Sequence, residues 1–242
     1  GIIDPWFNYF TFVTFYLILK HLSTRNSRSG YFYLEMAGLS LGLACLTKGP
    51  VSILLVAVSF FSLWISNPRR FEFKLREVSI FIGVTFLIII SWLGFEMFKN
   101  GTWFVKNFID YQIRLATSED AGHGGFLGYH FIILFFRMFP ASIFIFNQKK
   151  YFWESVELDV FRRAMLILLV VVLLIFSIVK TKIIHYSSLG YFPISFLASY
   201  GITTIISDRK INSATRWLGL LIGLIFAVFF IIIVFVGRNP HW

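Results

Sequence analysis

Residues 216–236 read RWLGLLIGLIFAVFFIIIVFV, and no charged residue follows Arg216 in this run. A second run, residues 78–98, reads VSIFIGVTFLIIISWLGFEMF and carries one charge, at Glu96. About 20 mostly apolar residues are enough for a helix to cross the hydrocarbon core of a bilayer. Because lipid offers no hydrogen-bond partners, the backbone of such a run must satisfy its own polar groups, as a helix does. These runs therefore predict a membrane protein.

The rest of the chain has the same character. Of its 242 residues 57% are hydrophobic and 14% charged, whereas soluble domains carry about 25% charged residues. The ten-residue alternating segments of a transmembrane barrel are missing from the sequence. We therefore predict an all-α, polytopic protein, a single transmembrane domain over 1–242, with about eight spans near 5–22, 31–47, 50–66, 78–98, 126–146, 161–179, 186–206 and 216–236.

The basic residues indicate an orientation. The net charge is +10, which in a soluble protein would suggest a nucleic-acid partner. Here the charges lie between apolar runs, so we predict membrane lipids as neighbours and no nucleic acid. Fourteen of the 22 Lys and Arg lie in alternate connections, near 20–28, 69–76, 149–163 and 209–216. The positive-inside rule then places these connections in the cytoplasm of a multi-pass inner-membrane protein, and segment 99–125 outside.

Segment 99–125 is the longest outward connection. Its aromatic residues recur among charged ones, at Trp103, Phe104, Phe108 and Tyr111. This spacing predicts an amphipathic helix lying in the membrane interface. An ordinary connecting loop with interfacial aromatic residues is the alternative.

Small residues and the single cysteine allow two further inferences. The pairs Gly38/Gly42 and Gly219/Gly223 have the small-xxx-small spacing that favours close helix packing. Cys45 is the only cysteine, which excludes a disulfide or a cysteine metal cluster within this chain.

The turn at residues 46–50, LTKGP, interrupts two apolar runs. Gly49 and Pro50 are turn-forming residues, so Lys48 is expected at the outer membrane surface. Either this lysine only anchors the helix at the interface, or it takes part in a binding site.

A glycine-rich loop follows at residues 119–125, EDAGHGG. Glycines let a backbone approach a ligand closely, and His123 beside Glu119 and Asp120 suits proton transfer or binding of a divalent metal. One histidine is not a metal site by itself, so further ligands would have to come from elsewhere. A solvent-exposed flexible loop is the alternative.

Cationic and hydroxyl groups crowd the outer boundary at residues 180–186, KTKIIHY. Lys182, His185 and Tyr186, together with Arg114, offer a point charge, a hydroxyl and a guanidinium fork, which suit a phosphate. Interface anchoring is the alternative. Asp4, at the start of the first span, is favourable for the helix dipole alone.

These motifs together resemble one known family. Residues 46–50 resemble its LTKGP break, and residues 114–125, RLATSEDAGHGG, resemble its RF.TSE.GHGG loop. Residues 180–193, KTKIIHYSSLGYFP, resemble its K.K.PHY…P stretch, with Ile184 where the family has Pro, and Asp4-Pro5 resembles its DP helix start. The family is the lipid A aminoarabinose transferase and protein O-mannosyltransferase group, multi-pass glycosyltransferases of the GT-C class.

The resemblance implies a function. Such enzymes transfer a sugar from a polyprenyl-phosphate donor to a lipid A-like or protein acceptor at the extracytoplasmic face. By this resemblance Arg114 and Tyr186 would contact the lipid phosphate, Asp4 would be a supporting acid, and substrate-binding positions would include Lys48, Glu119, His123, Lys182 and His185. No cofactor is implied with certainty; a divalent metal near His123 is left open.

The resemblance also implies that the general base is an acid in a loop preceding Gly1. The chain opens without Met in the middle of this pattern, so a fragment that is inactive alone is expected. The alternative function is a transporter or flippase of polyprenyl-linked glycans, for which we would expect half-repeats and mid-membrane polar groups. A purely structural subunit gives no reason for polar motifs to share one face.

Overall fold

The computed structural model describes residues 3–25, 27–117, 125–148, 156–180 and 182–238. The described part of the chain is helical throughout, with no strand in it. The helices in chain order are α1 (Asp4–Ser23), α2 (Arg28–Lys48), α3 (Val51–Ser66), α4 (Leu75–Asn100), α5 (Trp103–Thr117), α6 (Tyr129–Arg137), α7 (Ala141–Phe144), α8 (Val156–Ile178), the 3-10 helix η1 (Tyr186–Gly190), α9 (Tyr191–Asp208) and α10 (Ser213–Arg238).

The predicted all-α fold is confirmed, with one difference. Seven of the eight expected spans form as long helices near their predicted bounds. The expected span 126–146 is instead divided into α6, which ends at Arg137, and the short α7. Pro140 lies at the break and precedes α7 directly. A proline cannot donate the hydrogen bond that a continuing helix requires, and it disfavours helical geometry in the residue before it.

Several of these helices suit a bilayer. By length and composition, four described segments could cross a membrane: Leu75–Asn100, Leu158–Ile178, Tyr186–Asp208 and Ser213–Val236. In α4 and in α10, only 6% of the most apolar 18-residue stretch is buried within the protein. Their apolar side chains therefore face outward, as expected where lipid tails are the solvent. This is a membrane protein.

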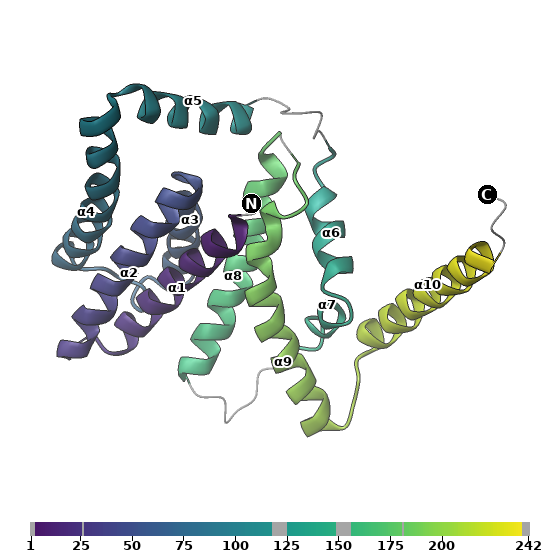
Figure 1. Ribbon diagram of the computed structural model, residues 1–242. Helices are drawn as coiled ribbons and strands as arrows, with labels where there is room; N and C mark the ends of the chain where they lie inside the picture. Colours follow the sequence, from purple (N-terminus) through teal and green to yellow (C-terminus); the bar gives the residue numbers. More distant parts are fainter. Residues whose placement is uncertain (1–2, 26, 118–124, 149–155, 181, 239–242) are drawn as a thin grey trace.

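The helices form two groups, which meet where α3 packs on α8 and where α1 packs on η1 (Figure 1). In one group α1 packs along α2, and α2 packs along α4. In the other α8 and α9 pack together, with α6 beside α8 and α7 beside α9. Helix α5 runs across one end of α4, whereas α10 extends away from the rest and contacts α7.

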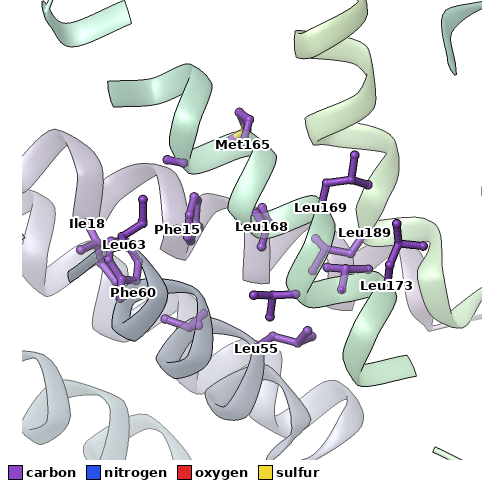
Figure 2. Close-up of a cluster of buried hydrophobic side chains, with 14 of the residues drawn as sticks. Phe15, Ile18, Leu55, Phe60, Leu63, Met165, Leu168, Leu169, Leu173 and Leu189 are labelled. Atoms are coloured by element: carbon purple, nitrogen blue, oxygen red, sulfur yellow. The ribbon is translucent and has the colours of Figure 1, made fainter. Parts of the chain in front are cut away.

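The main core lies where the two groups meet. Figure 2 shows Phe15 of α1 and Leu63 of α3 facing Leu168 of α8, all almost completely buried. Leu189 of η1 extends the same cluster toward α9. This core fixes the position of η1 relative to α1 and therefore the end of the bundle where Asp4 lies.

Glycines allow α2 and α4 to approach closely. A Cβ added at Gly42 would lie 2.6 Å from Cβ of Ile88, and one at Gly38 would lie 2.9 Å from the carbonyl oxygen of Phe81. The expected close packing is thus confirmed for this pair. In the second pair Gly219 also approaches a neighbour closely, since an added Cβ would lie 3.2 Å from Cδ1 of Ile143. Gly223 has no atom within 4 Å of an added Cβ among the described residues.

A buried ionic cluster joins the helices at the other end of the bundle. Arg25 donates from Nε to Glu77 Oε1 over 2.6 Å and also pairs with the second oxygen. His21 Nε2 lies 3.5 Å from the same carboxylate, and the backbone N–H of Lys74 donates to it over 2.9 Å. Glu77 thereby caps the start of α4 and ties it to the end of α1.

Candidate functional site

Asp4 and Lys48 form an ion pair at one end of the bundle. Asp4 is the first residue of α1 and Lys48 the last residue of α2. An acid at a helix N-terminus and a base at a C-terminus both interact favourably with the helix dipole. Gly49 then turns the chain with a φ of 80°, a conformation that glycine adopts without strain. Both side chains are largely buried, which strengthens their attraction.

Tyr186 completes this cluster from the far part of the sequence. The ammonium of Lys48 lies 3.9 Å from the centroid of the Tyr186 ring and 5.4 Å from that of Phe7. A cation over an aromatic face is attracted by the ring quadrupole, more strongly where water is excluded. Asp4, Lys48 and Tyr186, all predicted site residues, are thus brought together by three separate elements.

A hydrogen-bond chain fixes η1 against α1. Asn8 Nδ2 donates to Ser188 Oγ over 2.7 Å, and Ser188 Oγ donates to the carbonyl of His185 over 2.5 Å. His185 is half-buried and immediately precedes η1. The backbone that carries Tyr186 is therefore held by a buried side chain of the first helix.

Lys182 has an unexpected environment. Its ammonium donates to the carbonyls of Phe176, Ser177 and Val179 over 3.2, 2.5 and 2.6 Å. These carbonyls end α8 and would otherwise lack partners. Burial lowers the pKa of Lys182, while the carbonyl acceptors favour its charged form. An ammonium has three donors, so in this arrangement Lys182 closes the helix end and has none left for a phosphate.

His130 on α6 is a site neighbour that sequence reasoning left without a role. Its Nδ1 lies 3.1 Å from Ser187 Oγ, and its Nε2 is buried without a hydrogen-bond partner in the described part of the chain. A lone histidine in an apolar run gives no signal of such a contact, because Ser187 lies 57 residues away.

Arg114 lies near the end of α5, which forms the predicted helix of segment 99–125. Its guanidinium lies 5.3 Å from the ring centroid of Tyr111 on the same helix. A cavity of about 280 Å³ separates α5 from α4 and from the turn after Lys48. Phe104 and Phe108 line this cavity from α5, and Trp92 lines it from α4.

The predicted glycine-rich loop is only partly covered. Glu119 and His123 lie outside the described residues, so the prediction of a metal near His123 stays a prediction. Among the residues that the structure does describe, no three His, Cys, Asp or Glu side chains gather as metal ligands would.

The chemistry of the described cluster suits an anion. One ammonium, held by a carboxylate and an aromatic ring, lies beside η1 at the same end as α5 (Figure 1). A buried positive charge with a nearby phenol hydroxyl can stabilise a phosphate oxygen.

The known proteins that this chain matches are of the kind that its motifs resemble. Residues 2–102 match the family model described as dolichyl-phosphate-mannose-protein mannosyltransferase. The chain is 25% identical over 239 residues to an undecaprenyl phosphate-alpha-4-amino-4-deoxy-L-arabinose arabinosyl transferase of Wigglesworthia glossinidia brevipalpis. The chain is similar to these glycosyltransferases over the matched residues. A transferase of the same name from Pectobacterium carotovorum is 26% identical over 203 residues.

These relatives are longer than the chain. The alignments cover 96% and 80% of this chain but 41% and 35% of the two relatives. The fold is similar to the crystal structure of ArnT from Cupriavidus metallidurans bound to undecaprenyl phosphate, with a TM-score of 0.69 and 15% identity. That similarity covers 94% of this chain and 40% of ArnT. This likeness confirms the predicted polytopic helical fold.

Proposed function

We propose that this chain is part of a membrane glycosyltransferase that moves a sugar from a polyprenyl-phosphate donor to a lipid A-like or protein acceptor. The observation that carries the proposal is the cluster of Asp4, Lys48 and Tyr186, which presents a held ammonium beside a phenol at one end of the bundle. The names of the relatives, which are undecaprenyl phosphate-linked arabinosyl transferases, support the same substrate class.

The proposed step is displacement at the anomeric carbon of the donor. The bond between this carbon and the phosphate oxygen breaks, and a bond to the acceptor oxygen forms. The acceptor's proton passes to an ionised carboxylate, the general base, which the family resemblance places outside these residues. The polyprenyl phosphate leaves with the bonding electron pair, and positive charge from Lys48 and Arg114 together with the Tyr186 hydroxyl stabilises it.

Within this proposal the residues have different parts. Asp4 orients Lys48, and Arg114 reaches the phosphate from α5. Lys182 does not bind the phosphate in this proposal. It stabilises the end of α8 and thereby the connection that leads to Tyr186. His185, Glu119 and His123 are proposed as further substrate contacts on the same face.

An orientation belongs to the proposal. Residues 1–242 form one transmembrane domain whose segment 99–125, including α5, faces the extracytoplasmic side of the inner membrane. The asymmetry of the basic connections supports this. Single cysteines at Gly101 and Asn67 in a Cys45→Ser background test it with an impermeant thiol reagent in intact cells. Labelling at Gly101 alone is expected; labelling at Asn67 alone reverses the orientation.

The function is tested by measuring sugar transfer and donor binding in the full protein. Arg114→Ala removes a charge-assisted phosphate contact, and about 2–4 kcal/mol of transition-state stabilisation should be lost. Arg114→Lys should also be impaired, because a point charge replaces a fork. Lys106→Ala, on an exposed position of the same helix, is the matched control. Normal transfer by a folded Arg114→Ala protein rejects the assignment of Arg114, and lipid translocation without transfer favours the flippase.

A further inference from the structure

A second cavity lies at the end of the bundle away from Asp4. It has a volume of about 380 Å³ and is enclosed by the last turns of α1, the connection between α3 and α4, and the start of α8. Lys20 lines it sixteen residues after Asp4 in the same helix. At 1.5 Å per residue the two positions are about 24 Å apart along the helix axis. This cavity is therefore separate from the candidate functional site.

Two cations stand at this cavity, Lys20 from α1 and Arg70 from the connection before α4. Both side chains are exposed. Within the described ranges neither forms an ion pair, and no described lining residue carries a carboxylate. Arg25, the nearby arginine on the same connection as Thr24, is instead occupied by Glu77. The described lining of the cavity therefore carries two positive charges and no negative one.

The walls below these cations are apolar and aromatic. Tyr16 lies one turn before Lys20 on the same face of α1, and its ring meets Phe161 of α8 edge to face at 6.2 Å. Buried Phe71 and Leu19 complete the wall. Polarity thus changes within one helical turn from cationic to apolar, which is the gradient between a lipid headgroup and its acyl chains.

We propose that this cavity binds an anionic phospholipid, with its phosphate between Lys20 and Arg70 and the start of its acyl chains against Tyr16 and Phe161. Basic pockets between transmembrane helices recognise acidic headgroups in this way. Charge complementarity selects an anionic lipid over a zwitterionic one. The apolar wall selects a lipid over a free phosphate ion, which would gain nothing from the aromatic rings.

The test is lipid binding to the detergent-purified protein, measured by native mass spectrometry. Dioleoyl-phosphatidylglycerol and dioleoyl-phosphatidylcholine differ in headgroup and share acyl chains, so their comparison isolates the charge. We expect the anionic lipid to bind tighter. The double variant Lys20→Gln/Arg70→Gln should lose about 30-fold in affinity for it, since each basic residue contributes about 1 kcal/mol.

A matched control separates this cavity from general surface charge. Arg69→Gln/Lys210→Gln removes two exposed cations, one from the connection before α4 and one from the connection before α10, without touching the cavity lining. It should change the affinity less than threefold. Glycerol phosphate at the lipid's concentration should not displace the bound lipid. Equal binding of the two lipids, equal loss in both double variants, or displacement by glycerol phosphate would each overturn the proposal. If the Lys20→Gln/Arg70→Gln protein does not fold, the single variants decide, with an expected loss of about fivefold each.

Discussion

The ammonium of Lys48 lies 3.9 Å from the centroid of the Tyr186 ring while it is paired with Asp4. One charge therefore links the start of α1, the end of α2 and the start of η1. Asp4 and Lys48 each have a side chain that is about one-eighth exposed, so neither charge is well solvated by water. The energetics of this cluster can be tested independently of any enzymatic assay.

Breaking the Asp4–Lys48 pair from one side should destabilise the protein. Asp4→Asn leaves a buried ammonium without its counter-charge, and we expect a loss of about 3 kcal/mol in unfolding free energy. Reversible unfolding in mixed detergent micelles measures it. Glu35→Gln, at an exposed acid of α2, is the control and should have little effect. The double variant Asp4→Asn/Lys48→Met should cost less than the sum of the two single changes; additive costs would argue against the pair.

Tyr186 should stabilise Lys48 through its ring rather than through its hydroxyl. Tyr186→Phe keeps the aromatic face, whereas Tyr186→Leu removes it. The leucine variant should be less stable than the phenylalanine variant by about 1–2 kcal/mol, the range of a desolvated cation–π contact. The difference should shrink in a Lys48→Met background. If it stays the same there, packing and not the cation explains it.

Gly42 should tolerate no side chain. Its added Cβ would lie 2.6 Å from Cβ of Ile88 and 3.1 Å from the carbonyl oxygen of Thr85. Gly42→Ala must push α2 away from α4, and we expect a cost of about 1–3 kcal/mol. Gly83→Ala on α4 has no atom within 4 Å among the described residues, so it should be neutral or slightly stabilising through helix propensity. Equal unfolding free energies for the two variants would contradict the close packing.

Glu77 should be the more important of the two acids near Arg25. Glu77→Gln removes the carboxylate that accepts from Arg25 and caps α4, and a loss of about 3 kcal/mol is expected because Arg25 then lacks its counter-charge. Glu72 offers Arg25 its backbone carbonyl, which Glu72→Gln leaves intact, so this variant should resemble the parent. Thermal unfolding of both proteins in detergent separates them.

The sequence predicts the spans well because hydrophobic length is a local property. Seven stretches form long helices near their predicted bounds, and α5 forms within the segment whose aromatic spacing favours a helix. The break at Pro140 shows the limit of this reasoning. Its neighbours are apolar on both sides, so hydropathy alone predicts one continuous span. The helix nevertheless breaks there, because proline has no backbone N–H to donate.

The candidate site was harder to predict, because its contacts join distant residues. From its local sequence, Lys48 could be only an anchor at the membrane interface. Its contacts with Asp4 and Tyr186 arise from the fold. The cationic residues of segment 180–186 all suit a phosphate by composition, yet Lys182 turns back to the end of the preceding helix, α8. Side-chain direction depends on how the chain leaves α8, which residue types alone do not specify.

The hydrogen bond from Asn8 to Ser188 spans 180 residues of chain. During synthesis α1 therefore leaves the ribosome well before η1 does. Until then Asn8 lacks its partner Ser188, and an unpaired polar side chain in a membrane helix is costly in lipid. Asp4 can already pair with Lys48 once α2 has followed. The contact between α1 and η1 can therefore form only after Ser188 has been synthesised, whereas the Asp4–Lys48 pair needs only α1 and α2.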